Sequence, residues 1–101
     1  MSFIFLYVTA SSQKEAKNIA KIMINQKLAA CANIFPISSM YEWKGKIRDE
    51  KEWALIMKTT QNKSILAKKE IEKIHSYKVP CITEISVNPI LKYGEWIEKQ
   101  L

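Results

Sequence analysis

The centre of the chain reads Lys27-Leu-Ala-Ala-Cys31-Ala-Asn33-Ile-Phe-Pro36-Ile-Ser-Ser-Met-Tyr41-Glu-Trp43-Lys-Gly45-Lys-Ile47. This segment leaves a helical pattern, runs extended through a proline, and reaches a Lys-Gly pair at 44–45, where glycine tolerates the positive φ of a tight turn. The chain then returns and becomes strongly apolar over residues 53–57. The pattern predicts a long β-hairpin, in which the proline marks an edge, a bend or a bulge.

One strand and one helix are expected before the hairpin. Residues 3–9 are apolar on both faces of an alternating pattern, which predicts a strand that must be covered twice. Ser12-Gln-Lys-Glu15 has the spacing of a capping box, in which Glu15 reaches back to the Ser12 amide. Apolar residues three and four positions apart then predict a helix to about Lys27.

A helix, a strand and a short terminal helix are expected after the hairpin. Residues 59–62 supply candidate N-caps for a helix that ends near Ile74. Pro80 forces an extended exit, and residues 81–87 form the last predicted strand. The terminal helix places three apolar side chains on one face, namely Tyr93, Trp96 and Ile97.

The order strand, helix, strand, strand, helix, strand, with a terminal helix, is that of the α+β split βαβ or ferredoxin-like fold. We expect one domain over residues 1–101, with an antiparallel sheet and both main helices on one of its faces. The other face would be bare. Residues 3–9 and 53–57 would then form an apolar patch too large for a monomer, which predicts assembly through that face.

Composition narrows the class of function. The net charge is +6, but the basic residues of the predicted helices alternate with glutamate as on solvated surfaces, so we do not expect specific nucleic-acid binding. Two glycines allow no glycine-rich phosphate loop, and a single histidine leaves no obvious catalytic triad, so we expect no enzyme. Two cysteines in no C-x-x-C pattern and an apolar start too short to span a bilayer predict a cytoplasmic protein without membrane association.

A family resemblance rests on several segments in the same order along the chain. They are Lys27-Leu-Ala-Ala-Cys31-Ala-Asn33-Ile, Ser39-Met-Tyr41-Glu-Trp43-Lys-Gly45-Lys-Ile47, Lys58-Thr-Thr60, His75-Ser-Tyr77-Lys-Val79-Pro80 and Tyr93-Gly-Glu-Trp96. Together they resemble the CutA family, the divalent-cation tolerance proteins. The resemblance implies a ferredoxin-like homotrimer with inward-facing sheets, a cytoplasmic setting, and an association with copper or another divalent metal ion, without catalysis. A similarity of that trimer to PII-like signalling proteins implies an alternative, a small-molecule effector bound between subunits.

Copper(I) favours thiolate and imidazole ligands, and the candidates in this chain are His75, Cys81 and Cys31. At the positions that the resemblance associates with copper, the chain has Val8, Ile74 and His75, so only the histidine carries over. Cys81 replaces a glutamate that is usual in the family. Structural roles stay open beside metal binding, because a histidine can stabilise a helix end and a free cysteine is often a buried packing residue.

Aromatic residues of the hairpin have two interpretations. Tyr41, Trp43 and Trp53 are candidate anchors of the trimer interface, since aromatic side chains are enriched at interfaces. Alternatively, a ligand cleft between subunits is lined by Trp43, Glu50, Glu52, Lys58 and Tyr77. Lys58 and Glu52 have a further interpretation as an ordinary exposed ion pair.

Overall fold

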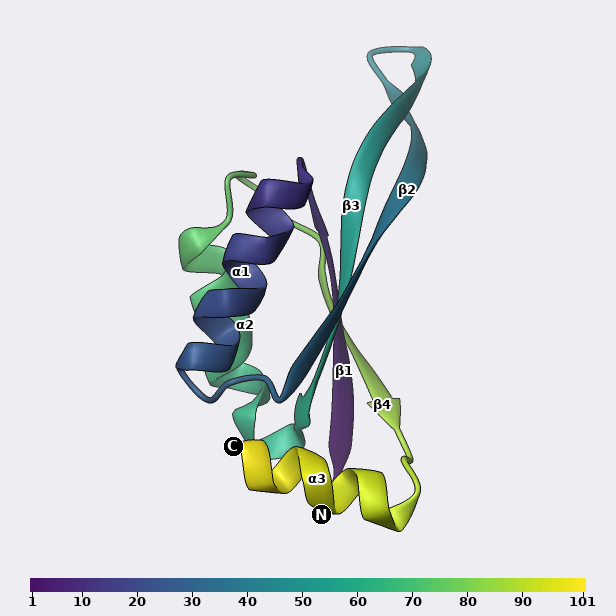
Figure 1. Ribbon diagram of the computed structural model, residues 1–101. Helices are drawn as coiled ribbons and strands as arrows, with labels where there is room; N and C mark the ends of the chain where they lie inside the picture. The colour runs from purple at the N-terminus through teal and green to yellow at the C-terminus, as the bar shows by residue number, and fades with distance from the viewer.

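The computed structural model describes all of residues 1–101 and contains one four-stranded antiparallel sheet with the strand order β2-β3-β1-β4. Its elements are β1 (Phe3–Ala10), α1 (Gln13–Asn25), β2 (Cys31–Trp43), β3 (Lys46–Thr60), the single 3-10 turn η1 (Gln61–Lys63), α2 (Ser64–Ile74), β4 (Ile82–Val87) and α3 (Leu91–Gln100). Helices α1 and α2 lie side by side on one face of the sheet (Figure 1). The predicted α+β ferredoxin-like fold is confirmed.

The core lies between the sheet and these two helices. Alternate residues of β1, namely Ile4, Leu6, Val8 and Ala10, are fully buried and face α1 and α2. Leu55 and Met57 pair with β1 in register and join the same cluster. Each large apolar side chain buried in this way contributes about 1.5–3 kcal/mol, so this layer accounts for the association of the helices with the sheet.

Helix α1 begins at the predicted cap. The Ser12 hydroxyl oxygen accepts a hydrogen bond from the Glu15 backbone N–H at 3.1 Å. The Glu15 carboxylate, however, accepts from the backbone and side chain of Ser11, not from the Ser12 amide. The helix also ends earlier than predicted, at Asn25, because Lys27 adopts a left-handed backbone with φ of 61° and is exposed.

The β2–β3 hairpin turns where the sequence predicts. Lys44 and Gly45 have φ of 50° and 78°, the paired positive values of a tight two-residue hairpin turn. Pro36 pairs with Trp53 in the ladder. A proline is tolerated there because β2 is an edge strand of the sheet. Because the β1 ladder ends at Ala10, the hairpin continues beyond the other strands as a projecting arm, residues 37–52 (Figure 1).

The predicted caps of the second helix are wrong. A 3-10 turn, Gln61–Lys63, intervenes, and helix α2 then begins without any side-chain cap. The Thr60 hydroxyl bonds the side chain of Asn62 instead of a helical N–H. Ser64, the first residue of α2, is bonded to Glu84 on β4, so this helix end is attached to the sheet by side chains.

Helix α3 covers one end of the sheet face opposite α1 and α2, a face that the sequence pattern predicts to be bare. A Cβ atom placed on Gly94 would lie 2.8 Å from Phe3 Cζ, so only glycine allows this close approach of helix to ring. The Lys58 ammonium group donates to the Tyr93 hydroxyl at 3.1 Å in the same region. In Figure 1 the helix crosses the lower end of the sheet.

The rest of that face, which we call the open face, has no covering element apart from the contact of Tyr93 with Lys58. By strand alternation and register, its side chains are Phe5, Tyr7, Thr9, Cys31, Asn33, Phe35, Ala54, Ile56, Lys58, Thr83 and Ile85. Phe35 and Ile85 are 37% and 44% exposed. The expectation that Trp53, Leu55 and Met57 add to this face is wrong, because pairing opposite Ala10, Val8 and Leu6 turns them toward the helices.

Candidate functional site

A cavity of about 830 Å³ lies between the arm and the segment that follows α2, and we call it the arm cleft. Its lining residues are Thr9, Tyr41, Trp43, Glu50, Glu52, Ser76, Tyr77, Lys78, Val79 and Cys81. The cleft therefore brings together all but Lys58 of the predicted cleft residues. A second cavity of about 830 Å³ lies over the first turns of α1, but its lining is almost entirely polar surface side chains.

Two phenols fix the two carboxylates of the arm cleft. The Tyr77 hydroxyl donates to Glu52 Oε2 at 2.6 Å, and the Tyr41 hydroxyl donates to Glu50 Oε1 at 2.5 Å. Burial together with the Glu52 bond raises the pKa of Tyr77 well above its usual value, and the Glu50 bond raises the pKa of Tyr41. Both phenols thus remain donors, while the second oxygen of each carboxylate has no hydrogen-bond partner within the chain.

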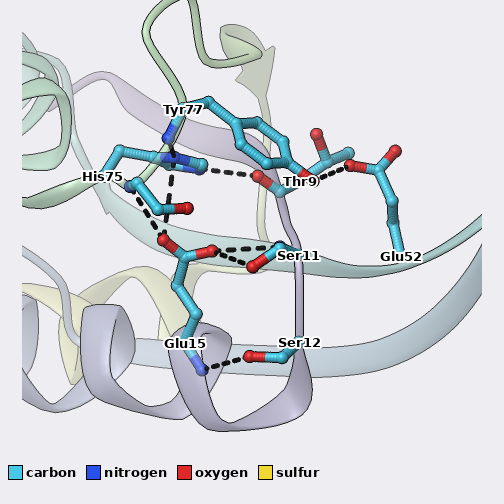
Figure 2. Close-up of polar contacts among 8 residues, drawn as sticks. Thr9, Ser11, Ser12, Glu15, Glu52, His75 and Tyr77 are labelled. Atoms are coloured by element: carbon cyan, nitrogen blue, oxygen red, sulfur yellow. Dashed lines mark hydrogen bonds and ion pairs between the residues drawn. The ribbon is translucent and has the colours of Figure 1, made fainter.

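His75 fixes the position of Tyr77, one of the residues that line the arm cleft (Figure 2). Its Nδ1 accepts the Tyr77 backbone N–H at 3.0 Å, and its Nε2 lies 2.7 Å from the Thr9 carbonyl oxygen. A carbonyl oxygen can only accept, so these contacts require a neutral imidazole with its proton on Nε2. The imidazole is buried. Its Nε2 contact attaches the segment after α2 to the end of β1, and its Nδ1 contact fixes Tyr77 within that segment.

Glu15, in the first turn of α1, also binds the segment that follows α2. Its Oε2 accepts the Ser76 backbone N–H at 2.8 Å, and its Oε1 accepts the backbone N–H and the hydroxyl of Ser11 at 3.0 and 2.9 Å. Burial disfavours the charged carboxylate, but these bonds from Ser76 and Ser11 outweigh it and hold the Glu15 pKa at about 2. The sequence flagged Glu15 only as a helix cap, because Ser76 is 61 residues away.

The three predicted metal ligands are not brought together. Cys31 is half-buried on β2 and pairs in register with Lys58, whereas Cys81 is exposed in the arm cleft with its Sγ 3.7 Å from Thr83 Oγ1. His75 offers a metal ion no nitrogen unless it gives up one of its two bonds. No three His, Cys, Asp or Glu side chains gather at a spacing that holds a metal ion. The residues of one chain therefore do not fit a resident metal centre.

Lys58 lies outside the arm cleft. Its Nζ contacts the Tyr93 hydroxyl at 3.1 Å and lies 5.9 Å and 5.3 Å from the ring centroids of Phe5 and Tyr93. Glu52 is further along β3, about 20 Å away at roughly 3.3 Å per residue. The interpretation of Lys58 and Glu52 as an ion pair is therefore wrong within one chain.

Comparisons with known proteins agree along nearly the whole chain. The family model described as "CutA1 divalent ion tolerance protein" matches residues 4–100. A divalent-cation tolerance protein CutA of Archaeoglobus fulgidus is 45% identical over 96 residues, which cover 94% of each chain. One of the same description from Thermotoga maritima is 36% identical over 99 residues, covering 97% of this chain and 98% of the relative.

Solved structures show the same similarity in three dimensions. A structure described as the periplasmic divalent cation tolerance protein CutA of Archaeoglobus fulgidus superposes with a TM-score of 0.92 at 41% identity, covering 97% of both chains. The structure of CutA1 from Oryza sativa gives a TM-score of 0.94 at 34% identity, covering 99% of this chain and 94% of the other. No helix of the chain has the length and apolar character needed to cross a membrane.

Proposed function

We propose a function from one premise: this chain belongs to the CutA1 family of divalent ion tolerance proteins. It acts in the tolerance of divalent cations, and it does so as a homotrimer assembled through the open face of the sheet. The family is described by a tolerance and not by a reaction, so the proposal includes no catalytic step. The relatives named above are likewise described by cation tolerance and not by signalling, so a PII-like effector is not part of it.

The observation that supports assembly is the composition of the open face. Phe5, Tyr7, Phe35, Ile56 and Ile85 present apolar surface there, and helix α3 covers only the end beside Phe3 and reaches Lys58 through Tyr93. An uncovered apolar face on a chain this small is typical of a subunit interface. The number of subunits is the one that the family resemblance implies.

Sedimentation equilibrium tests this assembly. At micromolar concentration we expect three times the chain mass of 11.7 kDa. Ile85→Lys places a charge on the open face and should shift the protein toward monomer, whereas Ile65→Lys, on the 70% exposed outer side of α2, should leave it assembled. A wild-type chain that is monomeric at micromolar concentration would contradict the proposal.

We propose Cys81 as the residue through which the chain contacts copper or another divalent metal ion. Of the three predicted ligands it alone is exposed, and thiolate sulfur is a preferred ligand of copper(I). Calorimetric titration with copper(I), copper(II) and zinc(II) should show a heat that Cys81→Ser removes and that Cys31→Ser retains. Equal heats for both variants and the wild type would show that the metal binds elsewhere.

We also propose a cytoplasmic setting, since both cysteines are free and free thiols persist in reducing compartments. Fractionation of cells that express the full-length protein tests this setting. Recovery in an extracytoplasmic fraction would contradict it.

A further inference from the structure

We infer that the arm cleft is completed by a second copy of the chain, whose Lys58 ammonium group pairs with the Glu52 and Glu50 carboxylates. The inference rests on the proposed assembly through the open face, and it names the contact that sets the alignment of neighbouring copies. Within one chain the cation and the two carboxylates lie at different places on β3 and cannot meet.

Lys58 is the only charged residue of the open face, where its neighbours in register are Phe5 and Cys31. Its ammonium group has one hydrogen bond, to the neutral Tyr93 hydroxyl, and otherwise lies over aromatic rings. When another subunit covers this face, water that solvates the ammonium group is displaced. A buried ammonium group without a carboxylate is strongly unfavourable, so the covering subunit must supply one.

The chain offers few carboxylates for this purpose. Continuing the strand alternation from the open face into the arm leads to Glu52 and then Glu50, and these are the acidic residues on that side of the sheet. Each has one oxygen fixed by a phenol and one that is free within the chain. The nearby acidic residues of α3, Glu95 and Glu98, are exposed and form no ion pair with Lys58.

The walls of the arm cleft also suit an ammonium group. Trp43 is 54% exposed and Tyr41 43% exposed, so aromatic surface is available beside the two carboxylates. A cation that reaches a carboxylate between aromatic rings gains both an ion pair and cation–π attraction. Lys78 lines the cleft as well, but it forms no ion pair with either carboxylate in the chain.

The contact is head to tail, because each copy uses one patch to give an ammonium group and a different patch to receive one. Contacts of this kind satisfy every copy only when the ring closes. The arm projects beyond the other strands and therefore provides the reach toward a neighbour that such a contact needs (Figure 1). The pairing thus fixes which end of one open face meets which arm.

Charge reversal tests the pairing. Lys58→Glu and Glu52→Lys should each raise the concentration for half-dissociation, measured by dilution and sedimentation, by at least tenfold. The double variant Lys58→Glu/Glu52→Lys should recover most of that loss. Lys51→Glu is the matched control, since it lies on the same strand with its side chain on the other side of the arm, and it should change the midpoint less than threefold.

Carbodiimide coupling tests contact directly, because it joins an ammonium group to a carboxylate only when they touch. A mixture of isotopically light and heavy protein should give a Lys58–Glu52 or Lys58–Glu50 cross-linked peptide of mixed mass, which proves that the two residues belong to different copies. If the wild type assembles but gives no such peptide, and if the double variant does not recover the assembly lost in the single variants, the inference is overturned while the proposed assembly stands. A monomeric wild type overturns both.

Discussion

Replacing Glu15 with glutamine should lower the free energy of unfolding by about 2 kcal/mol at neutral pH. The carboxylate joins the start of α1 to the segment after α2 through bonds from Ser11 and Ser76. Glutamine keeps one oxygen that can accept from Ser11, but its amide nitrogen then faces the Ser76 N–H as a second donor. The variant therefore loses the charged hydrogen bond to Ser76 and retains the helix cap at Ser12.

The magnitude follows from the carboxyl pKa, which is about 2 in the folded chain against a usual 4.5. At roughly 1.36 kcal/mol per pH unit, this difference corresponds to about 3 kcal/mol in favour of the charged folded form. The side chain is 14% exposed, so some of this energy is lost to solvent screening. The retained bond to Ser11 reduces the effect of the substitution further, to the stated 2 kcal/mol.

The same pKa values fix the sign of the pH dependence. Because folding depresses the pKa of Glu15, its stabilisation is fully present above pH 4.5 and is lost as the pH falls toward 2. Proton linkage leaves about two fifths of it at pH 3 and roughly an eighth at pH 2. The difference between the wild type and Glu15→Gln should therefore shrink in the same proportion over this range.

Denaturant unfolding at pH 7 and pH 3, at one fixed protein concentration, measures both quantities. Glu72→Gln, a change at an exposed position of α2, is the control and should differ from the wild type by less than 0.5 kcal/mol, about the usual size for a surface substitution. A Glu15→Gln variant that matches the control at pH 7 would refute the reasoning. So would a difference that stays constant between the two pH values.

Three other substitutions probe α3, the arm and the cleft wall. Gly94→Leu should lower the free energy of unfolding by about 1–3 kcal/mol, since its Cβ would lie 2.8 Å from Phe3 Cζ, and adding Phe3→Ala should recover part of the loss in denaturant unfolding. Trp43→Ala should weaken assembly in sedimentation before it alters copper affinity in calorimetry; the reverse order would place Trp43 at a cation site. Tyr77→Phe should remove one phenol from the last phase of an alkaline absorbance titration, because burial and the bond to Glu52 raise the Tyr77 pKa.

Local patterns predicted the elements of this fold well. The turn at Lys44-Gly45 and the cap at Ser12 depend on residues within a few positions of one another, and both are present. Helix α1 ended early because the left-handed backbone of Lys27 is set by the path into β2, which apolar spacing does not report. The sequence did not predict the 3-10 turn before α2, because polar residues such as those at 61–63 occur at the start of both 3-10 and α-helices.

Strand orientation was the harder problem. An unbroken apolar run such as residues 53–57 has no alternation, so the sequence cannot tell which side chains face the helices. Register decides it: pairing opposite Ala10 turns Trp53 toward the core. The cover that α3 gives to Phe3 depends on contact between the two ends of the chain, which no local pattern contains.

The candidate site likewise combines residues that are close in sequence with one that only long-range contacts bring in. Trp43, Glu50 and Glu52 share the arm cleft because they lie near one another on one hairpin, which the sequence could show. Tyr77 joins them only because His75 contacts Thr9 and Glu15 binds Ser76, and both contacts join distant parts of the chain.

The sequence predicts Lys58 as one of the cleft residues, but within one chain it lies about 20 Å from Glu52 along β3. Lys58 is the one charged residue of the open face, through which the proposed assembly forms. If the predicted set acts together, the cation must come from another subunit, so that the cleft is a property of the assembly and not of the fold.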